Sequence, residues 1–230
     1  MRVEERAISV TTHGRYLVAA PAHFAPATVP SAPGSAPDLP VLVGFHGYGE
    51  GASTHLARLR AIPGVERWLI VSIQGLHRFY QRKSEEVVAS WMTRQDRDLM
   101  ISDNVAYVSA VIDAVAREWN ISSTIVFAGF SQGVAMAFRA ATRGSHTVQG
   151  VIALGGDVPP DLEPHQLARV PAALIGRGGR DEWYTSSTHA LDEARLRAAG
   201  AVVTTSGFDA GHEWTADFSA AAGDFLARVR

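Results

Sequence analysis

The sequence contains no cysteine, so disulfide bonds, thiolate metal sites and a cysteine nucleophile are excluded. Charge of neither sign is in excess, with 21 Lys and Arg against 23 Asp and Glu. This balance gives no electrostatic reason to expect nucleic acid or an anionic membrane as a partner. No apolar run reaches the roughly 18–20 residues of a membrane helix, and the N-terminal MRVEERAISV lacks the apolar core of a signal peptide. We therefore expect a soluble cytoplasmic protein without a membrane span.

The chain is long enough for one substantial core. It has 230 residues, of which 47% are apolar, and a single α/β domain over residues 1–230 is the expectation. Residues 6–20 predict two short strands joined by a turn at His13-Gly14. Residues 22–40 are rich in Pro and Ala, have no periodicity and predict a surface loop. The sequence leaves the oligomeric state open, a homodimer included.

Apolar runs of strand length alternate with segments of helical period along the rest of the chain. The runs are continuous and β-branched, which is typical of strands buried on both faces; they cover residues 40–45, 67–75, 124–130, 148–156, 170–178 and 201–208. Helical periods cover residues 103–119, 132–143, 186–199 and 214–229. The alternation predicts a mostly parallel sheet with helices on both faces. Ligands of such sheets bind at the C-terminal ends of the strands.

The stretch GFSQG, residues 129–133, places Ser131 between a strand pattern and a helical pattern. In that context G-x-S-x-G is typical of a nucleophile elbow, a turn so tight that the residues two before and two after the serine must be small. The helix that follows directs N–H groups at the hydroxyl. The pattern therefore predicts Ser131 as a nucleophile. The alternative is a Gly-rich turn with an incidental serine.

A serine hydroxyl needs a general base to become a good nucleophile. In folds that carry this elbow, an acid and then a histidine follow the serine along the chain. His212 lies directly after the last predicted strand, at the sheet edge expected for Ser131. Three other histidines follow the serine but are less well placed, at the wrong end of a strand, in a surface segment and within a predicted helix: His146, His165 and His189.

The acid should follow the strand that precedes the strand of His212. Asp181 does so, after a Gly-rich turn. The adjacent Glu182 is a second choice, and Asp209 lies in the same loop as His212. Asp157 and Asp161 follow the strand before that of Asp181. We therefore predict Asp181 as the acid.

An oxyanion hole needs two N–H donors. One should come from Gln132, which follows the serine, and the second from the loop after the first long strand, FHGYGEG at residues 45–51. The glycines leave this backbone free to aim N–H groups inward, and Tyr48 is the expected donor. His46 precedes the serine in the chain, and we expect its ring to brace the loop.

These parts together resemble the phospholipase/carboxylesterase family of α/β-hydrolases, small single-domain esterases related to acyl-protein thioesterases. The matching pieces occur in the family order: FHGYGEG (45–51), SW (90–91), GFSQGVAMA (129–137), GRGGRDEWY (176–184) and AGHEW (210–214). The resemblance implies an α/β-hydrolase fold and hydrolysis of carboxylic esters or thioesters without a cofactor. It implies Ser131, Asp181 and His212 as the triad, with the amides of Gln132 and Tyr48 as oxyanion donors.

The chain departs from the family pattern at three places. Glu50 stands where the family commonly has Asp, Arg177-Gly178 stands where it has His-Gly, and Met92 and Thr93 follow Trp91 where it tends to have an aromatic residue and Asp. The first two departures leave the triad intact. The third affects the acyl pocket and so the substrate.

The segment 75–102 is long for a connection between a strand and a helix. Long connections are usually functional or disordered, and this one follows a strand whose C-terminal end should face the site. We expect Trp91 and Met92 to contact the acyl chain beside Ser131, and residues 77–83 to form part of the rim. The alternative is that Trp91 is a core residue.

Three other functions stay open. The same triad could cleave amides or peptides, the fold could be a catalytically silent binding protein, or a metal could drive hydrolysis. Intact Ser, Asp and His weigh against a silent protein. No H-E-x-x-H or similarly spaced ligand set occurs, which weighs against a metal. A small-molecule ester substrate, with no metal and no cofactor, is the expectation.

Overall fold

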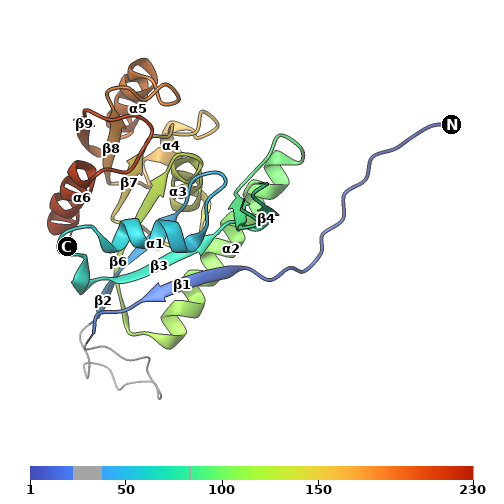
Figure 1. Cartoon of the computed structure of the whole chain (residues 1–230), viewed down its shortest axis with the longest axis horizontal. Helices are drawn as coiled ribbons and strands as arrows, with labels where there is room; N and C mark the ends of the chain where they lie inside the picture. The colour runs from blue at the N-terminus through green and yellow to red at the C-terminus, as the bar shows by residue number, and fades with distance from the viewer. Residues whose placement is uncertain (23–37, 83, 230) are drawn as a thin grey trace.

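The computed structural model describes residues 1–22, 38–82 and 84–229. The loop expected at residues 22–40 therefore lies almost entirely outside the described residues. Figure 1 shows a twisted central sheet with helices on both sides, and the N-terminal segment extending away from it.

Seven strands form the main sheet, in the order β1-β3-β2-β6-β7-β8-β9. Every neighbouring pair is parallel except β1 with β3, which puts the only antiparallel strand of this sheet at its edge. The bounds are β1 Arg15–Ala19, β2 Leu39–Phe45, β3 Leu69–Gln74, β6 Ile121–Phe130, β7 Gly150–Leu154, β8 Ala172–Gly178 and β9 Val202–Phe208. The six predicted apolar runs are confirmed as β2, β3, β6, β7, β8 and β9. Most of their side chains are buried because helices cover both faces. The edge strand β9 departs from the expected burial on both faces, since only Val203 among its residues is buried.

The two-strand prediction for residues 6–20 is wrong in its first half. Only β1 forms, and residues 1–14 are exposed and without regular structure. A strand needs a partner for its backbone N–H and C=O groups. Arg15–Ala19 finds that partner in β3, whereas the preceding residues have none in the described part of the chain.

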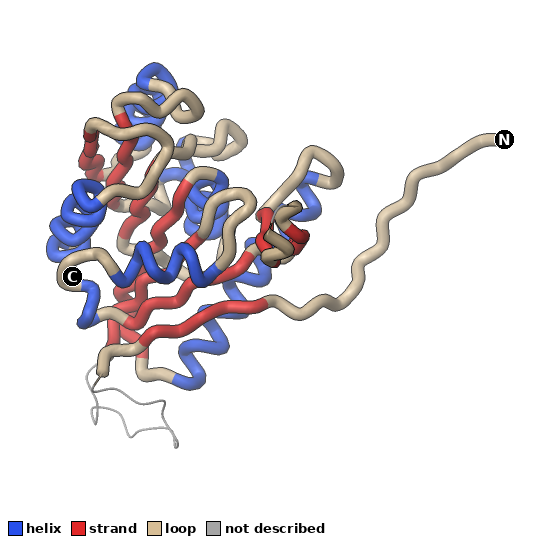
Figure 2. The backbone as a smooth tube through the Cα atoms, viewed as in Figure 1, coloured by secondary structure: helices blue, strands red, loops and turns tan. Residues whose placement is uncertain are grey.

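The helices are α1 Ala52–Arg60, α2 Arg97–Glu118, α3 Gln132–Arg143, α4 Pro164–Leu167, α5 Ser186–Ala198 and α6 Ala216–Arg228, with a 3₁₀ turn at Val65–Arg67. Figures 1 and 2 show how they cover the sheet. Along β2, Val41 and Val43 pack on the side of α2, α3 and α5, while Leu42 packs on the side of α1 and α6. The alternation of one strand thus serves two cores, as expected for a parallel sheet between helices.

Two helices differ from the sequence expectation. Helix α2 begins six residues before the predicted start at 103, because the apolar face continues backward through buried Ile101. Helix α1 was not predicted, since only three of its nine residues are buried, Ala52, His55 and Leu59. They share one helical face, but only Leu59 among them is a large apolar residue, so the hydrophobic pattern is weak. Among the described helices, α2 alone is long and apolar enough to cross a membrane by length and composition. Its apolar face is buried in the core, so it is a core helix.

The segment 75–102 contains a two-stranded antiparallel hairpin, β4 His77–Tyr80 and β5 Val87–Ser90, before α2 begins. The hairpin is not isolated from the main sheet's loops. Ala89 forms an antiparallel bridge with Glu50, in which the Gly49 N–H donates to the Ala89 oxygen and the Ala89 N–H donates to the Glu50 oxygen. The excursion therefore supports the loop that follows β2.

Candidate active site

Ser131 stands at a sharp turn between β6 and α3. Its backbone has φ 53° and ψ −121°, a conformation that costs a non-glycine residue about 1–3 kcal/mol. The flanking glycines are required by contact. A Cβ on Gly129 would lie 2.6 Å from the Gly133 oxygen, and one on Gly133 would lie 2.0 Å from the Phe45 oxygen. The turn thus has the geometry of a nucleophile elbow, with the hydroxyl raised above the strand ends.

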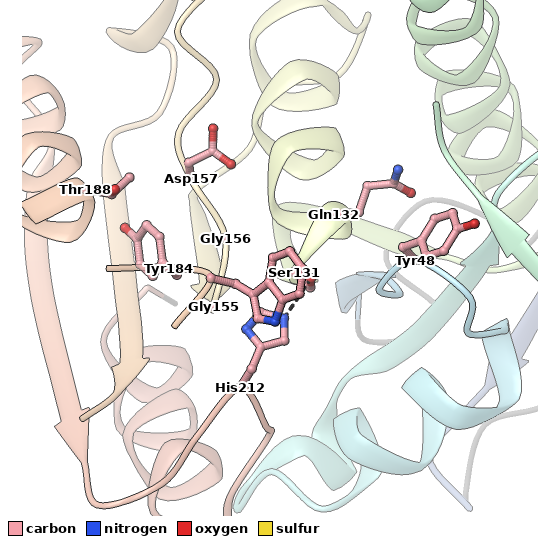
Figure 3. Close-up of a pocket in the computed structure, with 10 residues that line it drawn as sticks. Tyr48, Ser131, Gln132, Gly155, Gly156, Asp157, Tyr184, Thr188 and His212 are labelled. Atoms are coloured by element: carbon pink, nitrogen blue, oxygen red, sulfur yellow. Dashed lines mark hydrogen bonds between the residues drawn. The ribbon is translucent and has the colours of Figure 1, made fainter. Parts of the chain in front are cut away.

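Ser131, His212 and Asp181 form a continuous chain of hydrogen bonds. The His212 Nε2 lies 2.9 Å from the Ser131 Oγ, and the His212 Nδ1 lies 2.8 Å from the Asp181 Oδ2. The three residues follow β6, β9 and β8, whose C-terminal ends meet at one edge of the sheet. Figure 3 shows the His212 ring beside Ser131, with the hydrogen bond dashed. The sequence-predicted trio is brought together in space.

The Asp181 side chain is 1% exposed and fully engaged. Its Oδ1 accepts the N–H groups of Trp183 and Tyr184, both at 2.9 Å, which leaves Oδ2 for His212. Of the alternative acids, Asp157 lines the same cavity as Ser131 but makes no hydrogen bond to His212 within the described residues, and the others lie elsewhere. The Asp209 side chain is 89% exposed and pairs with Arg180.

The remaining carboxylates and histidines also lie apart from Ser131. Asp161 pairs with Arg139 and Arg143, and Glu182 is exposed. His146 lies against Asp113, and the His189 ring packs edge-on against Tyr184. None of these side chains makes a hydrogen bond to the Ser131 hydroxyl within the described residues.

The loop after β2 is braced by His46, as expected. The Nε2 of this buried ring accepts the Gly75 N–H at 3.0 Å, and its Nδ1 lies 2.7 Å from the Gly47 oxygen. Both contacts fit one neutral tautomer, protonated at Nδ1. Burial lowers the pKa of His46, which favours that neutral form.

Glu50, at the position where the family commonly has Asp, also stabilises the loop after β2. Its carboxylate accepts the Gly47 N–H at 2.9 Å and a bidentate pair of hydrogen bonds from the Arg58 guanidinium at 2.7 and 2.8 Å. Although burial acts in the opposite direction, the hydrogen bonds and charge of Arg58 lower the pKa of Glu50. The Arg58 guanidinium also stacks over Phe130, whose ring lies 5.1 Å from that of His212. The longer side chain thus links the loop to the wall of the site.

The amides of Tyr48 and Gln132 are the predicted oxyanion donors. In the described part of the chain, neither N–H donates to a protein group. The Gln132 side chain is tied down, with its Oε1 accepting the Trp91 N–H at 2.9 Å and its Nε2 donating to the Met92 oxygen at 2.9 Å. Gln132, one of the two predicted donors, is therefore fixed by the segment that follows the hairpin.

A cavity of about 540 Å³ opens at Ser131. Its walls combine two candidate catalytic residues, Ser131 and His212, with aromatic, acidic and small residues: Tyr48, Gln132, Gly155, Gly156, Asp157, Trp183, Tyr184 and Thr188. Figure 3 shows Gln132 and Tyr48 to one side of Ser131, and Asp157, Tyr184 and Thr188 to the other. This is a normal size for a small-molecule site.

The sequence model of one protein family, described as Phospholipase/Carboxylesterase, matches residues 31–229. This chain belongs to the phospholipase/carboxylesterase family. Membership makes the protein a hydrolase of the carboxylesterase/thioesterase type. No curated protein matches the sequence significantly.

Solved structures give the same fold. YahD, determined with malic acid, has 16% identity and a TM-score of 0.70, with 95% of this chain and 100% of that chain covered. The Bacillus cereus carboxylesterase has 17% identity and a TM-score of 0.67, with 94% and 95% covered. The carboxylesterase from Mesorhizobium loti has 20% identity and a TM-score of 0.67, with 82% and 88% covered. At these identities the likeness concerns the α/β-hydrolase fold.

The expectation that Trp91 and Met92 line the acyl pocket of this family member does not match the structure. Trp91 is 0% exposed and Met92 is 8% exposed, and neither lines the cavity. The Trp91 indole N–H donates to the His46 oxygen at 2.9 Å, and its ring lies 5.5 Å from that of Phe45. Trp91 is enclosed between the loop after β2 and Gln132, so its ring is not open to a substrate.

Residues 77–83 were expected at the rim. Residues 77–82 do not line the cavity, and Lys83 lies outside the described residues. The hairpin contacts two residues that line the cavity: the Phe79 ring packs 5.5 Å from that of Tyr48, and the Ser90 hydroxyl donates to the Gln132 Oε1 at 3.2 Å. Its role at the site is therefore indirect, through the ring of Tyr48 and the backbone bridge at Glu50.

Trp91→Ala is expected to destabilise the fold by about 3–5 kcal/mol, because it empties a fully enclosed site in the core. Hydrolysis of acetyl, butyryl and octanoyl esters should fall by the same factor for all three. Melting temperature and the three rates measure this. As a milder control, Trp91→Phe keeps an aromatic ring in the core but removes the hydrogen bond to the His46 oxygen. A shift in chain-length preference with an unchanged melting temperature would return Trp91 to the acyl pocket.

Several functional features escaped the sequence analysis. Gly155, at φ 65°, lies where a Cβ would come 3.1 Å from the His212 Cε1, so the backbone after β7 closes over the histidine ring. The sequence did contain a signal for this contact, because Gly155 and Gly156 end the predicted strand at residues 148–156. Tyr184 and Asp192 form a buried hydrogen bond of 3.1 Å behind the cavity wall, and burial raises the pKa of both groups. This contact had no signal in the sequence.

Proposed function

We propose that this protein hydrolyses carboxylic esters or thioesters through a covalent acyl-enzyme formed on Ser131. The observation that supports this best is the hydrogen-bonded chain Asp181–His212–Ser131, at 2.8 and 2.9 Å, at the mouth of a cavity. An ordinary serine side chain has no such partner. Family membership supports the reaction class, and the hydrogen-bond geometry supports the choice of these three residues.

Asp181 fixes the tautomer of the base. Its Oδ2 accepts the His212 Nδ1–H, which leaves Nε2 unprotonated and facing the Ser131 Oγ. In the first half-reaction His212 takes the Ser131 proton while the Oγ bonds to the substrate carbonyl carbon. The negative oxygen that forms accepts hydrogen bonds from the amides of Gln132 and Tyr48. The C–O or C–S bond then breaks, and the leaving alcohol or thiol departs with the proton from His212.

The second half-reaction repeats these steps with water. His212 takes a proton from the water as its oxygen attacks the acyl carbon, the bond to the Ser131 Oγ breaks, and Ser131 recovers the proton. The products are the carboxylic acid and the free enzyme. No cofactor is required. The cytoplasmic location stays a prediction of the sequence.

A fluorophosphonate should label Ser131 in a 1:1 ratio, because it traps an activated serine, and a chelator should change neither labelling nor the hydrolysis of p-nitrophenyl esters. Mass spectrometry of the labelled peptide locates the residue. A panel of p-nitrophenyl esters of increasing chain length then measures acyl preference. Loss of labelling on chelation would point to a metal-dependent hydrolase, and no labelling would point to a silent binding protein.

A further inference from the structure

One charged side chain in the catalytic cavity has no part in the proposed reaction. Asp157 follows β7 after the glycine pair that closes over His212, and it lines the same cavity as Ser131. Its carboxylate is exposed, and it makes no hydrogen bond or ion pair with the described residues. A free carboxylate at a substrate site sets the sign of the charge that the site accepts.

The backbone that carries Asp157 is held firmly. The next residue, Val158, donates its N–H to the Asp192 Oδ2 at 2.9 Å and accepts a hydrogen bond from Arg195 at 2.7 Å. The same Asp192 oxygen accepts the Tyr184 hydroxyl at 3.1 Å. Because Asp192 is buried and joins both walls, Asp157 is presented from a fixed loop, which lowers the cost of ordering it around a ligand.

Aromatic rings share the cavity with this carboxylate. Trp183 is 85% exposed and Tyr48 is 63% exposed, yet both line the site. The Trp183 backbone is fixed by its hydrogen bond to Asp181, which holds the residue beside the triad. Among the described residues, its indole N–H has no hydrogen-bond partner. Aromatic faces next to a carboxylate are the setting in which proteins bind alkylammonium groups.

No lysine or arginine is among the described residues that line the cavity. The arginines near the site are engaged with other groups. Arg58 binds Glu50, Arg180 binds Asp209, and Arg177 donates to the backbone oxygens of Tyr184 and Asp181. The formal charge that faces the cavity is therefore that of Asp157.

We propose that the catalytic cavity selects esters or thioesters that carry a positively charged nitrogen, held by the Asp157 carboxylate and the ring of Trp183, and disfavours substrates that carry a carboxylate. This inference rests on the proposed esterase function. Charge and cation–π contacts at partly exposed sites each contribute modestly, so the selectivity is graded rather than absolute.

Two pairs of substrates of matched shape test this. Butyrylcholine carries a quaternary nitrogen in its alcohol part, and 3,3-dimethylbutyl butyrate has a neutral quaternary carbon at the same place. Ethyl 4-(trimethylammonio)butyrate and ethyl 5,5-dimethylhexanoate differ in the same way on the acyl side. We expect kcat/KM to favour the cation by about tenfold in at least one pair. Asp157→Asn should remove most of that preference, with the neutral partner as the internal reference.

Glu182→Gln is the matched control, because Glu182 is an exposed carboxylate next to Trp183 that does not line the cavity. It should keep the preference. Equal rates within both pairs in the wild-type protein, or an equal loss in the two variants, would overturn the role of Asp157. Calorimetry of butyltrimethylammonium on Ser131→Ala, with and without Asp157→Asn, needs no turnover. If the cation binds in a way that depends on Asp157 but the wild-type protein hydrolyses no ester, the proposed function is wrong and this inference stands. If the cation does not bind, this inference is wrong.

Discussion

Ser131→Ala is expected to lower kcat by about 10⁴- to 10⁶-fold, the loss that removal of a triad nucleophile causes in other serine hydrolases. The structural reason is that no second hydroxyl is hydrogen-bonded to the His212 Nε2 in the described chain. Without the Oγ no acyl-enzyme forms, and the remaining oxyanion donors stabilise only a slow attack by water. Single-turnover and steady-state hydrolysis of a p-nitrophenyl ester measure the effect.

Ser123→Ala serves as the matched control, because Ser123 is an exposed residue near the opposite end of the same strand, β6. It should keep full activity. The melting temperature of Ser131→Ala should be close to that of the wild type, since the substitution removes one oxygen and leaves the turn in place. Near-wild-type activity in Ser131→Ala would contradict the acyl-enzyme proposal.

The meeting of Ser131, Asp181 and His212 in space could be predicted because their positions follow from topology. In a parallel sheet the C-terminal ends of strands lie at one edge, so residues that come directly after β6, β8 and β9 must be neighbours. Ser131, Asp181 and His212 each occupy such a position, and apolar runs mark those strands clearly in the sequence. The bounds of the runs, each correct to within a few residues, together with the GFSQG pattern and the expected order of acid and histidine, were enough to select these three residues.

The role of Trp91 could not be predicted, because it depends on tertiary contacts. A tryptophan near an active site has an apolar ring that suits either a core or an acyl pocket. The structure decides through two bonds, from the indole to the His46 oxygen and from the backbone to the Gln132 side chain, which join residues 45 and 41 positions away. Asp192 is similar, because a carboxylate on a helix is usually solvated and this one is 2% exposed.

Asp181→Asn is expected to lower kcat by about 10³- to 10⁴-fold, through the tautomer of His212. The position of the new amide group is fixed by the backbone. The oxygen must stay at the Oδ1 site, which accepts the N–H groups of Trp183 and Tyr184, so the NH₂ group takes the Oδ2 site that faces the His212 Nδ1. A donor there favours the ring protonated at Nε2, which cannot accept the proton of Ser131.

Asp209→Asn separates this effect from a general loss of negative charge near His212. Asp209 lies three positions before the histidine, but its side chain is 89% exposed and pairs with Arg180 rather than with the ring. A surface pair of this kind contributes about 0–1 kcal/mol to stability and holds no catalytic group. We therefore expect kcat to stay close to the wild-type value, with the activity of both variants measured on the same ester. If Asp209→Asn were the more damaging change, the loop after β9 would have to supply the acid, and Asp181 would be only a brace for the turn after β8.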